Sequence, residues 1–285
     1  MEPGRASSTA ERAALLRAAH QLLDQPTILD DPVVQRLIGP EQQATLAANR
    51  PEFERPVLRP LRASIAIRSR YAEDRLGDAV RRGVRQYVIL GAGLDSFAYR
   101  NPHPAADLRI YEVDHPDTQA RKRQRLGAAG IACPASLTFV PADFERQTLA
   151  DAMQRGGFDP CQPAFVSWLG VIVYLARDVV LGTLGYAASL APGSEIVFDY
   201  LPPPARLAER TRAAVAALAQ RAAAAGEPWV TYFEPGALAA ELAQLGFAQV
   251  EDFGPEAAFD RYCRGRRDGL RPGGAARLIR AALPG

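Results

Sequence analysis

From residue 86 onward the chain repeats one pattern: a short apolar run that ends at glycine or an acidic or aromatic residue, followed by a segment of helical composition. Five such runs lie at residues 86–91, 108–114, 137–143, 164–170 and 194–200. Segments of helical composition separate them, around 118–129, 147–155 and 177–190. Short strands that alternate with helices are typical of βαβ units, whose strands form a mostly parallel sheet. The pattern therefore predicts an α/β fold.

The residues before this repeat are predicted to be helical. Apolar residues recur at helical spacing over 11–23 and 61–83, and prolines divide the segment between them into short pieces. We expect residues 1–84 to form a helical cover on the sheet, in which His20 lies on the surface or half-buried.

The residues after the fifth run suggest a lid and two more strands. Three prolines precede an alanine- and arginine-rich helix, so that an insertion at about 202–234 could fold over the mouth of the sheet. A helix at 235–245 and apolar runs at 246–254 and 276–283 follow, and the two runs would pair antiparallel. Residues 85–285 are thus expected to form one domain, and the whole chain one structural unit.

Composition points to a small-molecule partner. The 34 basic and 32 acidic residues leave a net charge of only +2, too weak a field to recruit nucleic acid or a membrane. Three well-separated cysteines lack metal-ligand spacing, so we expect neither a metal site nor disulfides. The chain has no apolar run of about eighteen residues and does not begin like a signal peptide, from which we expect a cytoplasmic protein.

The strongest local motif is VILGAGLDSFAYR, residues 88–100. It predicts a strand that runs into Gly91-Ala92-Gly93 and then a helix. In an open α/β sheet, glycines in the first loop allow the backbone to approach a ligand closely. We therefore expect Gly91 and Gly93 to contact a cofactor.

The identity of that cofactor depends on the residues after the second glycine. A dinucleotide fingerprint requires a third glycine three residues later, but Ser96 stands there, preceded by Asp95. A carboxylate would repel a pyrophosphate, whereas it suits the ammonium group of an amino-acid moiety. This favours S-adenosyl-L-methionine over a nicotinamide dinucleotide.

Acidic residues also end the next two strands. Asp114 can accept hydrogen bonds from both ribose hydroxyls, with Glu112 as the alternative. Asp143 can accept from an adenine amino group while Phe144 packs on the ring. Three successive strand ends thus offer glycines, an acid for the ribose, and an acidic and an aromatic residue for the adenine. This arrangement fits one adenosine that lies across the sheet.

In these motifs the chain resembles the leucine carboxyl methyltransferase family of class I S-adenosylmethionine-dependent enzymes. It is most similar to the bacterial branch of that family, which resembles polyketide O-methyltransferases. The likeness covers roughly residues 60–280 and rests on blocks in the family's order, IRSRYAEDRL, VILGAGLDSFAYR, YEVDHPDTQARKRQRL, FVPADF, GFDPCQPAFVSWLGVIVYL, FEPGALAAELAQLGF and RYCRGRRDGLRPGG. It implies a Rossmann-like seven-stranded methyltransferase sheet with one antiparallel strand, an N-terminal helical extension and a helical lid.

The resemblance also implies site residues. Arg68 matches the arginine that holds the cofactor carboxylate, with Arg70 nearby, and Gly91 lies beside the methionine part. The ribose and adenine positions match Asp114, Asp143 and Phe144. Leu169 departs from the pattern, because many relatives carry a glutamate before Gly170; a contact to the cofactor's amino group is then missing or replaced, and Asp95 could compensate.

The reaction expected is O-methylation of a carboxylate or hydroxyl on a small molecule. A sulfonium methyl is already activated, so that positioning the acceptor and excluding water supply much of the acceleration. A hydroxyl acceptor would need a base, for which His103 and His115 are the histidines near the mouth, but no catalytic residue is assigned. Trp168 and Tyr174 are expected to line the acceptor pocket. A nicotinamide-dependent oxidoreductase and an inactive cofactor-binding protein remain as alternatives.

Overall fold

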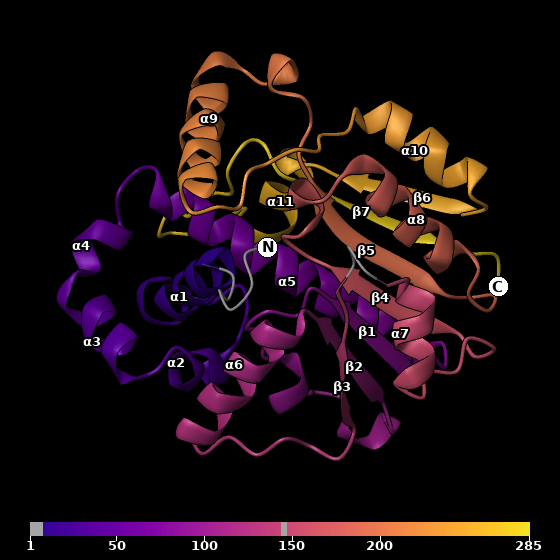
Figure 1. Ribbon diagram of the computed structural model, residues 1–285. Helices are drawn as coiled ribbons and strands as arrows, with labels where there is room; N and C mark the ends of the chain where they lie inside the picture. Colours follow the sequence, from indigo (N-terminus) through magenta and orange to yellow (C-terminus); the bar gives the residue numbers. More distant parts are fainter. Residues whose placement is uncertain (1–7, 144–146) are drawn as a thin grey trace.

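The computed structural model of the chain describes residues 8–143 and 147–285, and its centre is a seven-stranded sheet (Figure 1). Its strands are β1 (Gln86–Leu90), β2 (Arg109–Asp114), β3 (Leu137–Pro141), β4 (Ala164–Trp168), β5 (Glu195–Tyr200), β6 (Gln249–Phe253) and β7 (Arg277–Ala282). All seven coincide with the predicted apolar runs. The central strands β1, β2, β4 and β5 are buried along almost their whole length and read as nearly continuous apolar runs rather than as alternating patterns, which is why the sequence located them.

The strand order is β3-β2-β1-β4-β5-β7-β6. β1 to β5 run parallel, and β7 pairs antiparallel with both β5 and β6. The predicted antiparallel pairing of the two late strands is therefore confirmed. The order reverses between β1 and β4, and in open α/β sheets ligands bind in the crevice outside the carboxyl ends of the strands at such a switch point.

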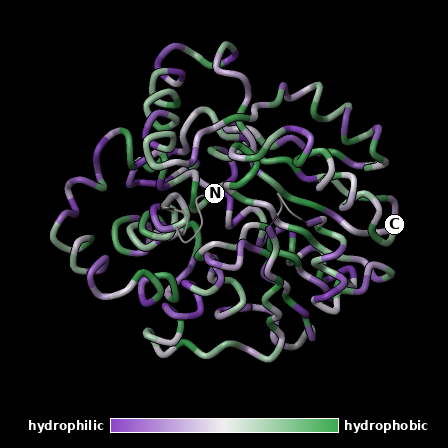
Figure 2. Tube along the Cα trace, in the orientation of Figure 1, coloured by the Kyte–Doolittle hydropathy of each residue, from purple (hydrophilic) through white to green (hydrophobic). Residues whose placement is uncertain are grey.

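Helices cover both faces of the sheet (Figure 1). Against one face pack α7 (Leu149–Arg155), α8 (Arg177–Ala188) and α10 (Pro235–Gln244). Against the other pack α5 (Leu58–Arg81), α6 (Pro116–Ala128) and α11 (Pro255–Tyr262). The strands between them form an apolar band through the middle of the molecule (Figure 2).

The N-terminal helices pack around the start of α5 (Figure 1). They are α1 (Ser8–Leu23), α2 (Pro32–Leu37), α3 (Pro40–Ala48) and α4 (Arg50–Phe53). Their apolar residues share one cluster with Ile65 of α5, Leu94 and Leu126 of α6. Among the described residues, no helix is both long and apolar enough to cross a bilayer.

The expectation for His20 is wrong, because its side chain is fully buried. Its Nδ1 lies 2.7 Å from Asp24 Oδ2, and its Nε2 accepts a hydrogen bond from the backbone N–H of Ile28 at 2.9 Å. Arg62 donates to both oxygens of Asp24 from α5. The imidazole thus closes the turn after α1 and replaces the hydrogen bonds that burial removes.

The helix expected after the glycine loop is absent, and a single 3-10 turn (η1, Phe97–Tyr99) takes its place. Asp95 Oδ1 accepts from the Phe97 N–H at 2.8 Å, and the Ser96 hydroxyl donates to Asp31 Oδ2 at 2.7 Å. These side chains hold the backbone in a turn, as Asp and Ser side chains do when they compete with helical hydrogen bonds. No helix N-terminus is therefore available here for a pyrophosphate.

The helix α9 (Glu209–Ala224) stands beyond the end of β5 where the lid was expected (Figure 1). It is mostly exposed and packs through Val215 on a small apolar cluster with Leu207 and Ala275. The segment after it returns along the loop that follows β4, where the Val230 N–H donates to the Val173 carbonyl at 2.8 Å. The backbone N–H of Thr9 donates to Glu227 Oε2 at 3.1 Å, so α1 contacts this insertion as well.

Candidate cofactor site

The loop after β1 packs closely against the loop after β4. Gly91 and Gly93 adopt φ angles of +62° and +48°, in the left-handed region that favours glycine. A Cβ on Gly91 would lie 2.4 Å from Cγ2 of Val171, in the loop after β4. Glycine is thus required at position 91 both by conformation and by space.

Asp114 lies directly beside this loop. Its Oδ2 accepts from the Gly93 N–H at 2.5 Å and its Oδ1 from the His115 N–H at 2.7 Å. Burial raises the pKa of Asp114, against the opposing effect of these two hydrogen bonds. Each carboxylate oxygen has two lone-pair sites, so that Asp114 can still accept from ribose hydroxyls.

Glu112, the alternative ribose acid, is paired with a buried lysine instead. Its carboxylate is fully buried and forms an ion pair with Lys122 of α6, with Nζ 2.7 Å from Oε2. Lys122 is also the only lysine in the sequence. Burial raises the pKa of Glu112 to about 7. The structure therefore favours Asp114 over Glu112 as the acid that faces a ribose.

Asp143 follows β3 at the same edge of the sheet. The Ala142 N–H donates to the Asp114 carbonyl at 2.8 Å, which fixes the two strand ends side by side. The ring of His115 lies next to Asp143, with Nε2 4.0 Å from Oδ2. Phe144, expected to pack on adenine, lies outside the described residues. Gly93, Asp114 and Asp143 thus lie along one line of strand ends, as a single adenosine requires.

Arg68 reaches the other end of this line from α5. Its Nη1 lies 3.2 Å from Asp199 Oδ2, at the end of β5, and Oδ1 of the same carboxylate accepts from the Gly170 N–H at 2.5 Å. A Cβ on Gly170 would lie 2.6 Å from Arg68 Nη1, so the guanidinium rests on the backbone after β4. We call these three residues the Arg68 junction.

Arg70 is oriented differently. Its Nε donates to Asp74 Oδ1 at 2.7 Å and its Nη1 to the Ile28 carbonyl at 3.1 Å, and its side chain is exposed. Two residues along a helix turn the side chain by about 200°, since each residue turns it by about 100°. The structure does not bring Arg70 to the Arg68 junction.

The remaining predicted site residues differ in how far they are buried. Asp95 is half-buried in the loop after β1, where one of its oxygens caps Phe97. Tyr174 is half-buried in the loop after β4, at the mouth of the crevice. Trp168, by contrast, is fully buried in the core beneath α8, because its position in β4 turns it away from α5. It packs in the core on the α8 side of the sheet.

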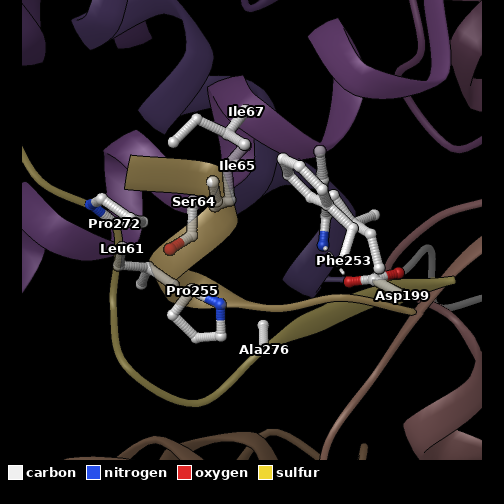
Figure 3. Close-up of a pocket in the computed structure, with 12 residues that line it drawn as sticks. Leu61, Ser64, Ile65, Ile67, Asp199, Phe253, Pro255, Pro272 and Ala276 are labelled. Carbon is white, nitrogen blue, oxygen red and sulfur yellow. Dashed lines mark hydrogen bonds and ion pairs between the residues drawn. The ribbon is translucent and has the colours of Figure 1, made fainter. Parts of the chain in front are cut away.

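A cavity opens beside the Arg68 junction, between α5 and the strands β5 to β7 (Figure 3). Its walls are mostly apolar, with Asp199 on one side and Pro272 on the opposite side (Figure 3). The residues that line it are Leu61, Ser64, Ile65, Ile67, Arg68, Asp199, Phe253, Pro255, Ala258, Pro272, Ala276 and Leu278. Sequence reasoning missed Asp199, although an acidic residue at the end of a strand was the signal that identified Asp114.

Comparison with known proteins agrees with this geometry. Residues 10–188, well over half of the chain, match the family model of leucine carboxyl methyltransferase. The chain belongs to the leucine carboxyl methyltransferase family. It is 32% identical to the Bacillus subtilis protein named "Putative S-adenosyl-L-methionine-dependent methyltransferase YktD" over 95% of both chains, and 36% identical to a Mycobacterium marinum protein named in the same way over 73% of this chain and 71% of that one.

Solved structures support the fold of this family member. A "putative methyltransferase" from Thermobifida fusca superposes with a TM-score of 0.58 at 18% identity, over all of this chain and 97% of the other. A protein of the DUF574 family from Streptomyces avermitilis gives 0.54 at 17% identity, over 96% and 97%. Family membership and the likeness to the Bacillus subtilis protein, rather than these structures, make the protein an S-adenosylmethionine-dependent methyltransferase instead of a nicotinamide-dependent oxidoreductase.

The site fits this cofactor. The Gly91 backbone offers close approach, Asp114 offers a partly buried acceptor, and Arg68 offers a cation for a carboxylate. Within the described part of the chain, no cluster of three or more His, Cys, Asp or Glu side chains is arranged to hold a metal ion.

Proposed function

We propose that this methyltransferase esterifies a carboxylate of a small molecule, with a hydroxyl as the second candidate acceptor. The observation that carries the proposal is the position of the three histidines in the sequence. A hydroxyl acceptor needs a base within hydrogen-bond reach, whereas a carboxylate is already anionic at neutral pH. A site without an available histidine or lysine therefore favours a carboxylate.

None of the three histidines lies at the Arg68 junction. His20 is buried against Asp24, and His115 caps α6 beside Asp143, at the adenine end of the site. His103 lies against Gly77 of α5, where burial lowers its pKa. Lys122, the single lysine, is buried in its ion pair with Glu112. The family's own name, leucine carboxyl methyltransferase, agrees with a carboxyl acceptor.

The mechanism requires the chain to hold two reactants in line and to keep water out. When bound, S-adenosylmethionine supplies an activated methyl group on its sulfonium. Asp114 would hold its ribose, Arg68 its carboxylate, and the backbone of Gly91 its methionine part. The apolar walls of the cavity in Figure 3 suit an acceptor with an apolar body, and α9 stands where it can limit access of water.

Methyl transfer from isotopically labelled cofactor to a panel of carboxylic acids and phenols tests the proposal. We expect label in organic product that mild base releases as methanol, because esters hydrolyse under conditions in which aryl methyl ethers survive. Base-stable label would instead assign a hydroxyl acceptor. Cofactor binding without transfer to any member of the panel would favour the inactive binding protein.

A further inference from the structure

Asp199 lies where two neighbouring strands end. In the parallel pairing of β4 with β5, Trp168 is opposite Phe198, so the next residues, Leu169 and Asp199, are neighbours. Leu169 packs on the apolar cluster beneath α5, and Asp199 lines the cavity on that same side. A ligand at this edge therefore meets an apolar side chain on β4 and a carboxylate on β5.

The carboxylate of Asp199 organises the Arg68 junction. One oxygen accepts from the Gly170 N–H and the other lies 3.2 Å from the Arg68 guanidinium. Gly170 has a φ of +73°, and its missing Cβ leaves the space that the guanidinium fills. The carboxylate is thus fixed by a backbone donor, and it fixes the arginine in turn.

Asp199 also retains capacity for a ligand. A carboxylate has about four lone-pair sites, and the two contacts just described use two of them. Its side chain remains 13% exposed, beside an Arg68 side chain that is 22% exposed. The amino-acid end of the cofactor is a zwitterion, so a cation and an anion held 3.2 Å apart at an accessible edge match its carboxylate and its ammonium.

The other acidic candidates fit this role less well. One carboxylate oxygen of Asp95 already accepts a hydrogen bond from the Phe97 N–H within the same turn. Asp114 is held by the backbone of Gly93 and His115 at the ribose position. Leu169 offers no acceptor.

We propose that Asp199 is a cofactor-binding residue: it accepts a hydrogen bond from the ammonium of the methionine part and holds Arg68 in position for the carboxylate. Two ligands related to the cofactor separate this role from a structural one. S-adenosylhomocysteine carries the amino-acid end, whereas 5′-methylthioadenosine has the same adenosine and sulfur without it. Calorimetry on Asp199→Asn should show about tenfold or more loss of affinity for S-adenosylhomocysteine and less than twofold loss for methylthioadenosine.

Asp252→Asn is the matched control. Asp252 on β6 also pairs with an arginine, with Arg277 Nε 3.0 Å from Oδ1, but it does not belong to the Arg68 junction. This variant should bind both ligands as the unaltered protein does. In the Asp199→Asn background, Leu169→Glu should restore part of the lost affinity for S-adenosylhomocysteine, because it returns a carboxylate from the neighbouring strand.

Equal losses for the two ligands, or unchanged affinity for both, would overturn the proposal. If Asp199→Asn does not fold, Asp199→Glu makes the same comparison, since it keeps the charge and displaces the carboxylate by one methylene. Retained methylthioadenosine binding with weakened S-adenosylhomocysteine binding would again support the proposal. The assay does not depend on the acceptor, so its failure is distinct from failure of the carboxylate assignment.

Discussion

Asp114 is the residue on which cofactor affinity should depend most. A ribose that loses a charged acceptor loses strong hydrogen bonds, so Asp114→Ala should weaken binding of S-adenosylhomocysteine by about 2–3 kcal/mol. The variant also leaves the Gly93 and His115 N–H groups without their carboxylate acceptors. Calorimetry on the folded variant measures the change. Unchanged affinity would show that Asp114 does not bind the ribose and would favour Glu112 in that role.

The buried pair of Glu112 and Lys122 makes a prediction about pH. Burial raises the pKa of Glu112 from 4.5 to about 7. Between these values the folded chain binds more protons at this position than the unfolded chain does. The contribution of Glu112 to the free energy of unfolding is therefore greatest below pH 4.5. It falls as the pH rises towards 7, by on the order of 3 kcal/mol.

Urea unfolding at pH 5 and pH 8 checks this slope. The double variant Glu112→Gln/Lys122→Met removes both charges together, which avoids leaving one of them buried alone. Its free energy of unfolding should fall less between the two pH values than that of the unaltered protein. Identical pH slopes would show that Glu112 titrates near its ordinary pKa.

Among the elements, α1 is held to α5 by a buried ionic contact rather than by apolar packing alone. Burial by itself would raise the pKa of Asp24, but hydrogen bonds from His20 and Arg62 outweigh it and lower that pKa. Arg62→Met leaves Asp24 without its bidentate partner in the interior. We expect a loss of about 3–5 kcal/mol in the free energy of unfolding, measured by urea titration.

An exposed ion pair in the same cover provides the control. Arg55 and Glu52 lie 2.8 Å apart with side chains 62% and 52% exposed. Arg55→Met should change the free energy of unfolding by less than about 1 kcal/mol. Similar losses in both variants would mean that the replacement of arginine by methionine, and not the loss of the buried contact, lowers the free energy of unfolding.

At the scale of the whole molecule, the cover and the sheet should unfold together. The apolar cluster of α1 to α4 is completed by Ile65, Leu94 and Leu126, which belong to the sheet domain or its first helix. Trp168 in the core and Trp229 beside the apolar cluster of α9 report on different regions. Fluorescence and circular dichroism should therefore give one coincident thermal transition, which S-adenosylhomocysteine raises and NAD does not. Two separate transitions would contradict a single unit.

Local sequence patterns were enough to predict the seven strands and the glycine loop, and they offered Asp114 as the ribose acid. The central strands are buried on both faces and mostly apolar, and the left-handed turn after β1 needs glycine. Cofactor class followed, because the glycine and acid positions fall at successive strand ends.

The orientation and the partners of individual side chains became clear only in the folded chain. Folding turned Arg70 away from the Arg68 junction, buried His20, replaced the helix after the glycine loop by a turn, and brought Asp199 to Arg68 from 131 residues away. These outcomes depend on contacts between segments far apart in the chain. Burial and pairing are properties of the packed molecule, which local periodicity does not encode.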